Sequence, residues 1–194
     1  MTTSTRAART LAAAAATSSA LVLGAVVATP ARAVDTPPPV SAWELSPGRI
    51  GPVAAGMTRK QLVRSGTWVR TRGADCEGTI RPRDRYLAGF GWYVGDTSRR
   101  LESVVTSRRS VRTTRGIAVG DTLAAVRRAY PSHLSRPRRG IDQQWYVVHR
   151  AGTRYLAFGL DRVGTTAPGG SARVVAFSVS RTRAYAPYLD GCGF

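Results

Sequence analysis

The chain has 194 residues, 43% of them hydrophobic, with 29 Lys and Arg against 11 Asp and Glu and a formal net charge of +18. This hydrophobic content supports a packed core and excludes a wholly disordered chain. Because two cysteines and two histidines are too few for a zinc finger or an iron–sulfur site, and no phosphate-binding, dinucleotide-binding or hydrolase motif occurs, we predict no metal, no cofactor and no catalytic residue.

The first 33 residues have the layout of a secretory signal peptide. Arg6 and Arg9 precede an uncharged stretch of Ala, Leu and Val, and an A-x-A cleavage motif ends at Ala33. A membrane anchor is the alternative, but the stretch is Ala-rich and only weakly hydrophobic. We therefore predict a secreted protein, extracellular or associated with the cell wall, with no transmembrane segment after cleavage.

Cys76 and Cys192 are the two cysteines of the chain. An even number of cysteines in an exported protein favours a disulfide, here one that ties the C-terminal tail to the first third of the fold. Such a long loop contributes roughly 4–5 kcal/mol in the chain-entropy account. The alternative is two free thiols, one of them catalytic, with His133 or His149 as its base.

Three pairs of segments match each other in the same order along the chain. The matches are 53–64 with 117–128, 86–91 with 155–159, and 101–107 with 174–180. They predict a tandem repeat. The predicted segments are a signal peptide 1–33, a Pro-rich spacer 34–44, repeat unit one 45–110, repeat unit two 111–181 and a C-terminal tail 182–194.

Each unit is predicted to contain a strand, a short helix and three antiparallel strands. Thr58 and Thr122 are good helix N-caps, and Thr58 forms a capping box with Gln61. Gly66 and Pro131 are expected to end the two helices. Alternating apolar residues predict the strands, and we expect one such set to be buried on the sheet: Val175, Phe177 and Val179.

The segments Gly56-Met57-Thr58 and Gly120-Asp121-Thr122, with the aromatic strands after them, resemble two known families. A single unit is similar to the small-protein-A type of outer-membrane assembly lipoprotein, and two tandem copies resemble the beta-lactamase inhibitory proteins of actinomycetes. The resemblance covers about residues 45–181. It implies an α+β fold of two tandem helix-on-antiparallel-sheet repeats sharing a curved sheet, with a concave surface that grips a target protein.

Arginines and aromatic residues supply the candidate partner-binding residues. In a strand, Arg81, Arg83 and Arg85 would point to one face, while Arg136, Arg138 and Arg139 form a second cluster in a predicted loop. Neighbours in a strand face opposite sides, so we expect one ring of each adjacent pair to be buried and the other outward. The two pairs are Trp92 with Tyr93 and Trp145 with Tyr146.

These patterns favour a secreted, non-enzymatic binding module of inhibitor type that grips an acidic extracellular or envelope protein. The excess of arginine also suits an anionic polymer, but the export signal argues against nucleic acid as the natural partner. The alternative is a cell-envelope hydrolase with an unrecognised site that uses His149.

Overall fold

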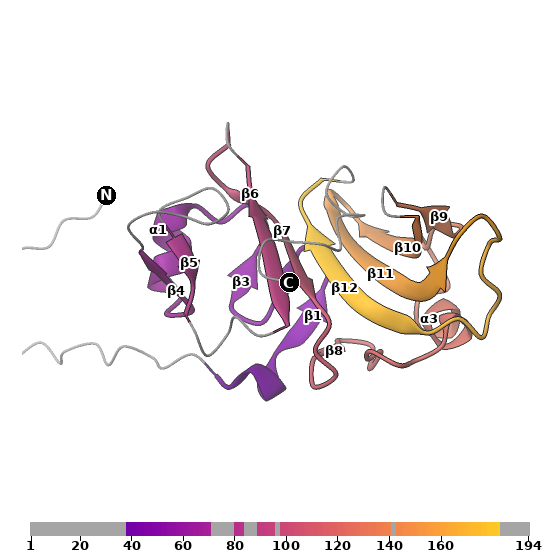
Figure 1. Ribbon diagram of the computed structural model, residues 1–194. Coiled ribbons are helices and arrows are strands. Elements are labelled where there is room, and N and C mark those ends of the chain that lie inside the picture. Colours follow the sequence, from indigo (N-terminus) through magenta and orange to yellow (C-terminus); the bar gives the residue numbers. More distant parts are fainter. Residues whose placement is uncertain (1–37, 71–79, 84–88, 96–97, 141–142, 183–194) are drawn as a thin grey trace, which may run out of the picture. The chain divides into compact units, whose positions relative to one another are not determined.

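The computed structural model describes residues 38–70, 80–83, 89–95, 98–140 and 143–182 (Figure 1). Every described residue belongs to one compact unit. The predicted signal peptide, Cys76, Cys192 and Arg85 lie outside the described residues.

The described chain is mostly strand. Its helices are a 3-10 turn η1 (Val40–Ala42) and the α-helices α1 (Arg59–Arg64) and α3 (Leu123–Ala129). Its strands are β1 (Glu44–Ser46), β2 (Arg49–Ile50), β3 (Val53–Ala54), β4 (Trp68–Arg70), β5 (Ile80–Pro82), β6 (Phe90–Val94), β7 (Leu101–Thr106), β8 (Arg112–Thr113), β9 (Arg138–Arg139), β10 (Gln144–Ala151), β11 (Arg154–Val163) and β12 (Val174–Ser180).

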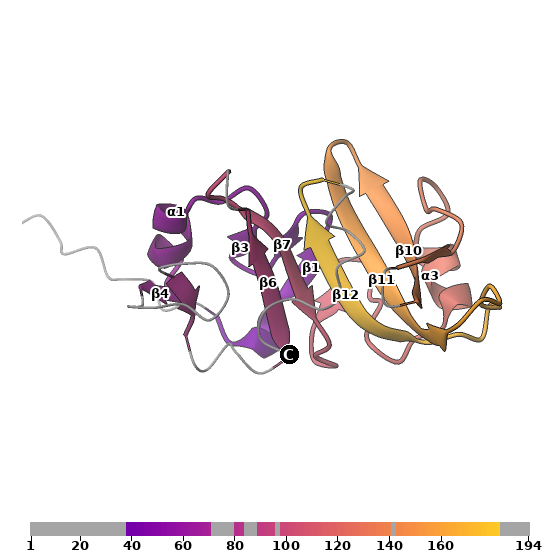
Figure 2. The ribbon, with the colours of Figure 1, turned by 45° about the horizontal axis from the view of Figure 1, so that its top comes forward.

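These strands form three sheets. The largest is antiparallel with the order β6-β7-β12-β11-β10-β9, and Figure 2 shows β7 and β12 side by side within it. A second sheet has the order β3-β2-β1-β8, in which β1 and β8 pair in parallel, and β4 with β5 forms a third.

The predicted α+β fold with one shared curved sheet is therefore wrong: the described protein is β-rich. The helices α1 and α3 span only six and seven residues. The strands β3 and β4 on either side of α1, and β8 before α3, belong to the smaller sheets, whereas β9 after α3 joins the six-stranded sheet.

The helix ends nevertheless follow the sequence. The Thr58 hydroxyl accepts from the Gln61 backbone N–H at 3.3 Å, and the Gln61 side chain accepts from the Thr58 N–H at 2.8 Å, which confirms the capping box. The Thr122 hydroxyl accepts from the Ala125 N–H at 3.2 Å. Gly66 follows α1 with a positive φ of 72°, and Pro131 comes directly after the C-cap of α3.

The same kind of contact holds the segment just before the helix of each predicted unit. Arg100 Nη1 donates to the Gly56 carbonyl at 2.9 Å, and Arg173 Nη1 donates to the Gly120 carbonyl at 2.8 Å. Each of these arginines immediately precedes the last strand of its predicted unit, β7 or β12. The tandem repeat itself stays a prediction, but its two halves are anchored in the same way.

A β-bulge changes which residues of β12 are buried. Gly159 pairs with Ala176 and Leu160 pairs with Val174, so Val175 has no partner between them. The bulge interrupts the alternation of the strand. The prediction that Val175 is buried was therefore wrong, since it is half-buried while its neighbour Val174 points into the core.

The core contains both tryptophans that flank α1. Trp43 packs edge-on against Phe90 at 5.5 Å between ring centroids, and Trp68 packs in the same way against Trp92. Val40 and Trp43 fall within the predicted Pro-rich spacer, so the packed fold extends into that segment.

Candidate functional site

The strand register divides the large sheet into two faces. One cross-strand row, Trp92–Val104–Val179–Leu156–His149, lies on the core side. The adjacent row, Tyr93–Ser103–Ser180–Tyr155–Arg150, therefore lies on the opposite side, because successive residues of a strand point to opposite faces.

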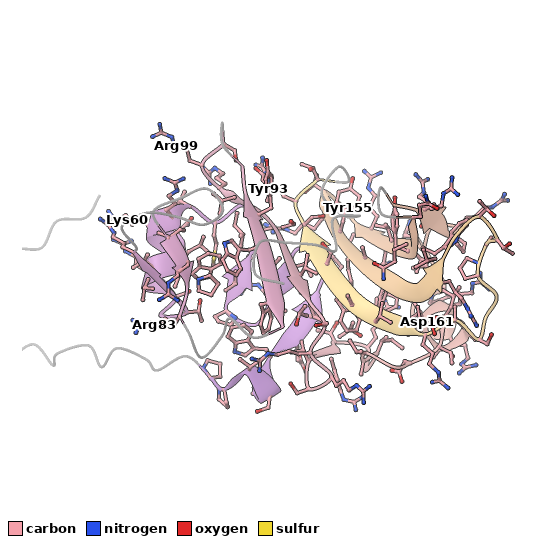
Figure 3. The ribbon with its side chains drawn as sticks, viewed as in Figure 1. Lys60, Arg83, Tyr93, Arg99, Tyr155 and Asp161 are labelled. Carbon is pink, nitrogen blue, oxygen red and sulfur yellow. The ribbon has the colours of Figure 1, made fainter. Side chains whose placement is uncertain are left out.

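We name this opposite side the tyrosine face. It holds Tyr93, Tyr146 and Tyr155, and the positions between them carry small or aliphatic residues: Gly91, Ser103, Val105, Ala157, Gly159, Ala176, Ser178 and Ser180. Figure 3 labels Tyr93 and Tyr155, which the register places on either side of the central pair β7 and β12.

The middle of the tyrosine face is closed to solvent. Val105, Ala157, Ser178 and Ser180 are each fully buried. The face is accessible at its edges: Arg138 in β9 and Arg150 in β10 are exposed, and Tyr155 in β11 and Tyr93 in β6 are half-buried. We call the edge formed by Arg138, Arg150 and Tyr155 the rim.

The predicted aromatic pairs are split between the two faces. Trp92 is 6% exposed in the core, and Trp145 packs half-buried against the same core with its Nε1 donating to the Gly164 carbonyl at 2.9 Å. Tyr93 and Tyr146 lie on the tyrosine face, Tyr93 half-buried and Tyr146 9% exposed. The two tryptophans are therefore not part of the candidate surface.

The described members of the first predicted arginine group, Arg81 and Arg83, do not lie on the tyrosine face. Arg81 belongs to the two-stranded sheet, where it pairs with Val69, and its Nη1 donates to the Pro82 carbonyl at 3.4 Å. Arg83 is exposed just after β5, as Figure 3 shows. No strand pairing joins these described arginines to the tyrosine face.

The second predicted arginine cluster, unlike the first, contributes a residue to the tyrosine face. Arg138 and Arg139 were predicted in a loop but form strand β9, where Arg138 pairs with Tyr146 and Arg139 pairs with Trp145. Arg138 therefore points to the tyrosine face and Arg139 to the opposite face. Cross-strand pairing of this kind depends on register, which the sequence did not reveal.

A surface hollow of about 290 Å³ opens at the same edge. Its lining residues are His133, Leu134, Ser135, Val148, Arg150 and Tyr155. Tyr155 and Arg150, which pair across β10 and β11, were not among the predicted site residues. The alternation of β11 could have marked Tyr155 as opposite in face to the buried Leu156.

His149 lies in the core and not in this hollow. Its ring centroid is 4.7 Å from that of Tyr130, its exposure is 8%, and its Nδ1 has no hydrogen-bond partner among the described residues. Burial lowers the pKa of His149, and the positive charge of Arg115 lowers it further. Burial also raises the pKa of the Tyr130 hydroxyl.

The arrangement around His149 does not favour the hydrolase alternative. The Ser135 hydroxyl accepts from the Val148 N–H at 3.0 Å and lines the hollow on the other face of β10, away from the His149 side chain. Within the described ranges no group of three or more His, Cys, Asp or Glu residues could hold a metal ion.

The carboxylates of the described residues do not neutralise the rim. Asp121 accepts from the Ala118 N–H at 2.8 Å, Asp161 accepts from the Arg173 N–H at 2.8 Å, and Glu102 is buried and binds Ser98 and Arg181. The fourth, Glu44, lies in β1 of another sheet. Among the described residues, no carboxylate forms an ion pair with the exposed arginines of the rim.

Comparisons with protein-family models, with curated proteins and with solved structures found no match to this chain. Across the part of the chain that the structure describes, no helix is long and apolar enough to cross a membrane.

Proposed function

We propose that this protein is an exported, non-enzymatic binding module that holds an acidic extracellular or envelope protein at the rim of its tyrosine face. The observation that carries the proposal is the register of β9, β10 and β11. It places Arg138 beside Tyr146 and Arg150 beside Tyr155 on one side of the sheet.

This composition suits a protein interface. Tyrosine and arginine are enriched among the residues that dominate binding energy, because each combines a large contact area with a polar group. The exposed arginines raise the rate of association with an acidic partner through long-range attraction. Residues 34–194, without Arg6, Arg9 and Arg32 of the predicted signal peptide, keep a formal net charge of 18 − 3 = +15, which extends that attraction over the exported chain.

Two features of the sequence support the rest of the proposal. The predicted signal peptide supports export, and the resemblance to the beta-lactamase inhibitory proteins supports a protein as the partner. An anionic polymer is the competing partner, since it also needs arginines, but it does not need tyrosines placed in register with them.

The proposal is tested by capture with a matched pair of variants. Residues 34–194 are immobilised and exposed to culture supernatant and to cell-wall extract of the source cells. The same is done with Arg138→Gln and Arg139→Gln, which remove the same charge from adjacent, exposed positions on opposite faces. We expect a captured protein to be lost with Arg138→Gln and retained with Arg139→Gln.

Equal loss with both variants would contradict the proposal, because it would mean that net charge alone attracts the partner. A captured polysaccharide or nucleic acid in place of a protein would favour the anionic polymer. Turnover of a cell-wall substrate that is lost with His149→Ala would favour the hydrolase.

A further inference from the structure

The hollow at the β10 edge combines apolar walls with a positive charge. Leu134 is half-buried and Val148 is buried, and the half-buried ring of Tyr155 lines the same space. Arg150 and His133, both exposed, complete the lining. The hollow therefore offers an aliphatic surface together with a cation.

Backbone hydrogen bonds hold the hollow in shape. Ser135 Oγ accepts from the Val148 N–H at 3.0 Å, and the Ser135 N–H donates to the Val148 carbonyl at 2.8 Å. The Arg150 N–H donates to the His133 carbonyl at 3.1 Å. His133 has a left-handed backbone, with φ of 59°, a conformation that is uncommon outside glycine and collects at binding sites.

Arg150 forms no ion pair with a carboxylate in the described part of the chain. Its Nε donates to the Gly152 carbonyl at 2.8 Å, which fixes the side chain along the β10–β11 turn. Its terminal amino groups have no partner among the described residues, and no described carboxylate lines the hollow. The site thus presents a positioned guanidinium with no carboxylate partner among the residues that the structure describes.

We propose that this hollow receives a glutamate side chain of the acidic partner. The carboxylate would bind the terminal amino groups of Arg150, and the methylene groups would lie on Leu134, Val148 and the ring of Tyr155. A phosphate or sulfate group has no apolar stem to cover these walls, so the lining favours a glutamate. This inference rests on the proposed function and names the chemistry that the partner must carry.

The test uses a small probe in place of the unknown partner. The ¹⁵N-labelled protein, residues 34–194, is titrated with Ac-Glu-Glu-NH₂ and separately with the uncharged Ac-Gln-Gln-NH₂. We expect saturable shifts of the Ser135, Val148 and Arg150 amides with the glutamate peptide only. Arg150→Gln should weaken its binding about fivefold, the scale of an exposed charge pair, while Arg139→Gln leaves these shifts in place.

A second variant guards against loss of folding, because Arg150→Gln also removes the hydrogen bond to Gly152. Tyr155→Leu leaves that hydrogen bond and the backbone pairing intact, and it should also weaken the glutamate peptide. Equal binding of both peptides, shifts confined to other residues, or equal weakening by Arg139→Gln would overturn the inference.

The two proposals fail separately. If the glutamate peptide ignores the hollow while capture of the partner still depends on Arg138, only the glutamate site is wrong. If the peptide binds as expected but capture does not depend on Arg138, the proposed function is wrong and the anion site stands.

Discussion

At the scale of single residues, the most constrained titratable group is His149. A histidine in a strand of aromatic and β-branched residues is open to a catalytic reading from sequence alone. The structure places its ring against Tyr130, and Arg115 lies over the same tyrosine with its guanidinium carbon 4.9 Å from the ring centroid. Its neutral form is therefore the one that the fold accommodates.

This burial makes the stability of the protein depend on pH. The pKa of His149 is lowered in the folded state, first by burial and then by Arg115, from an ordinary value of 6.5. A folded state that binds its proton less readily than the unfolded chain loses stability as the pH falls below 6.5. We expect the free energy of unfolding, measured by urea titration, to decrease between pH 7.5 and pH 5.5.

The variant His149→Gln should flatten that decrease, because it removes the titrating group from the core. His133→Gln is the matched control: His133 is exposed and its charge is the last of the causes that lower the His149 pKa, so most of the decrease should remain. A slope that persists in His149→Gln would show that another group is responsible.

At the scale of elements, local signals were sufficient for some features and not for others. Thr58, Thr122, Gly66 and Pro131 set the helix ends through hydrogen bonds and backbone preferences within a few residues, so the sequence predicted them. Pairing between distant strands could not be predicted in this way. The bulge at Val175, the strand β9 and the Tyr155–Arg150 pair all depend on register, which is decided by packing over the whole sheet.

The segment before β1 shows the same limit. Trp43 follows a run of prolines that predicts an extended spacer, yet it is 4% exposed in the core. It is held beneath the turn between β2 and β3, where Gly51 has a φ of +51° and its N–H donates to the Glu44 carbonyl. A tryptophan that reaches this turn from the spacer is a tertiary contact that local sequence does not encode.

This contact predicts unequal effects at two glycines. A Cβ on Gly51 would lie 2.5 Å from the Trp43 ring, whereas a Cβ on Gly116, which has a φ of +81°, would meet nothing within 4 Å. Both alanine variants should lose about 1–2 kcal/mol to the left-handed backbone. Gly51→Ala should lose roughly 1–3 kcal/mol more by overpacking, as measured by chemical denaturation. Equal losses would mean that Trp43 is not packed under this turn.

At the scale of the whole molecule, the proposed function depends on one face of a sheet and on the net positive charge of the chain. The composition indicated an acidic partner, and the aromatic pairs indicated a sheet surface. The sequence favoured Trp92 and Arg81, whereas the structure moves the candidate surface to Tyr155, Arg138 and Arg150 at the β9–β10 rim. The predicted disulfide between Cys76 and Cys192 stays a prediction.

The most direct measurement is the binding kinetics of the captured partner by surface plasmon resonance. The long-range attraction of exposed arginines acts on encounter, and a Debye length of about 3 Å at 1 M salt removes it. We expect salt to slow association and leave dissociation nearly unchanged. Tyr155→Leu should instead speed dissociation, because a packed ring is lost from the interface. Unchanged dissociation of Tyr155→Leu, with affinity that falls log-linearly with salt as in counterion release, would contradict the account.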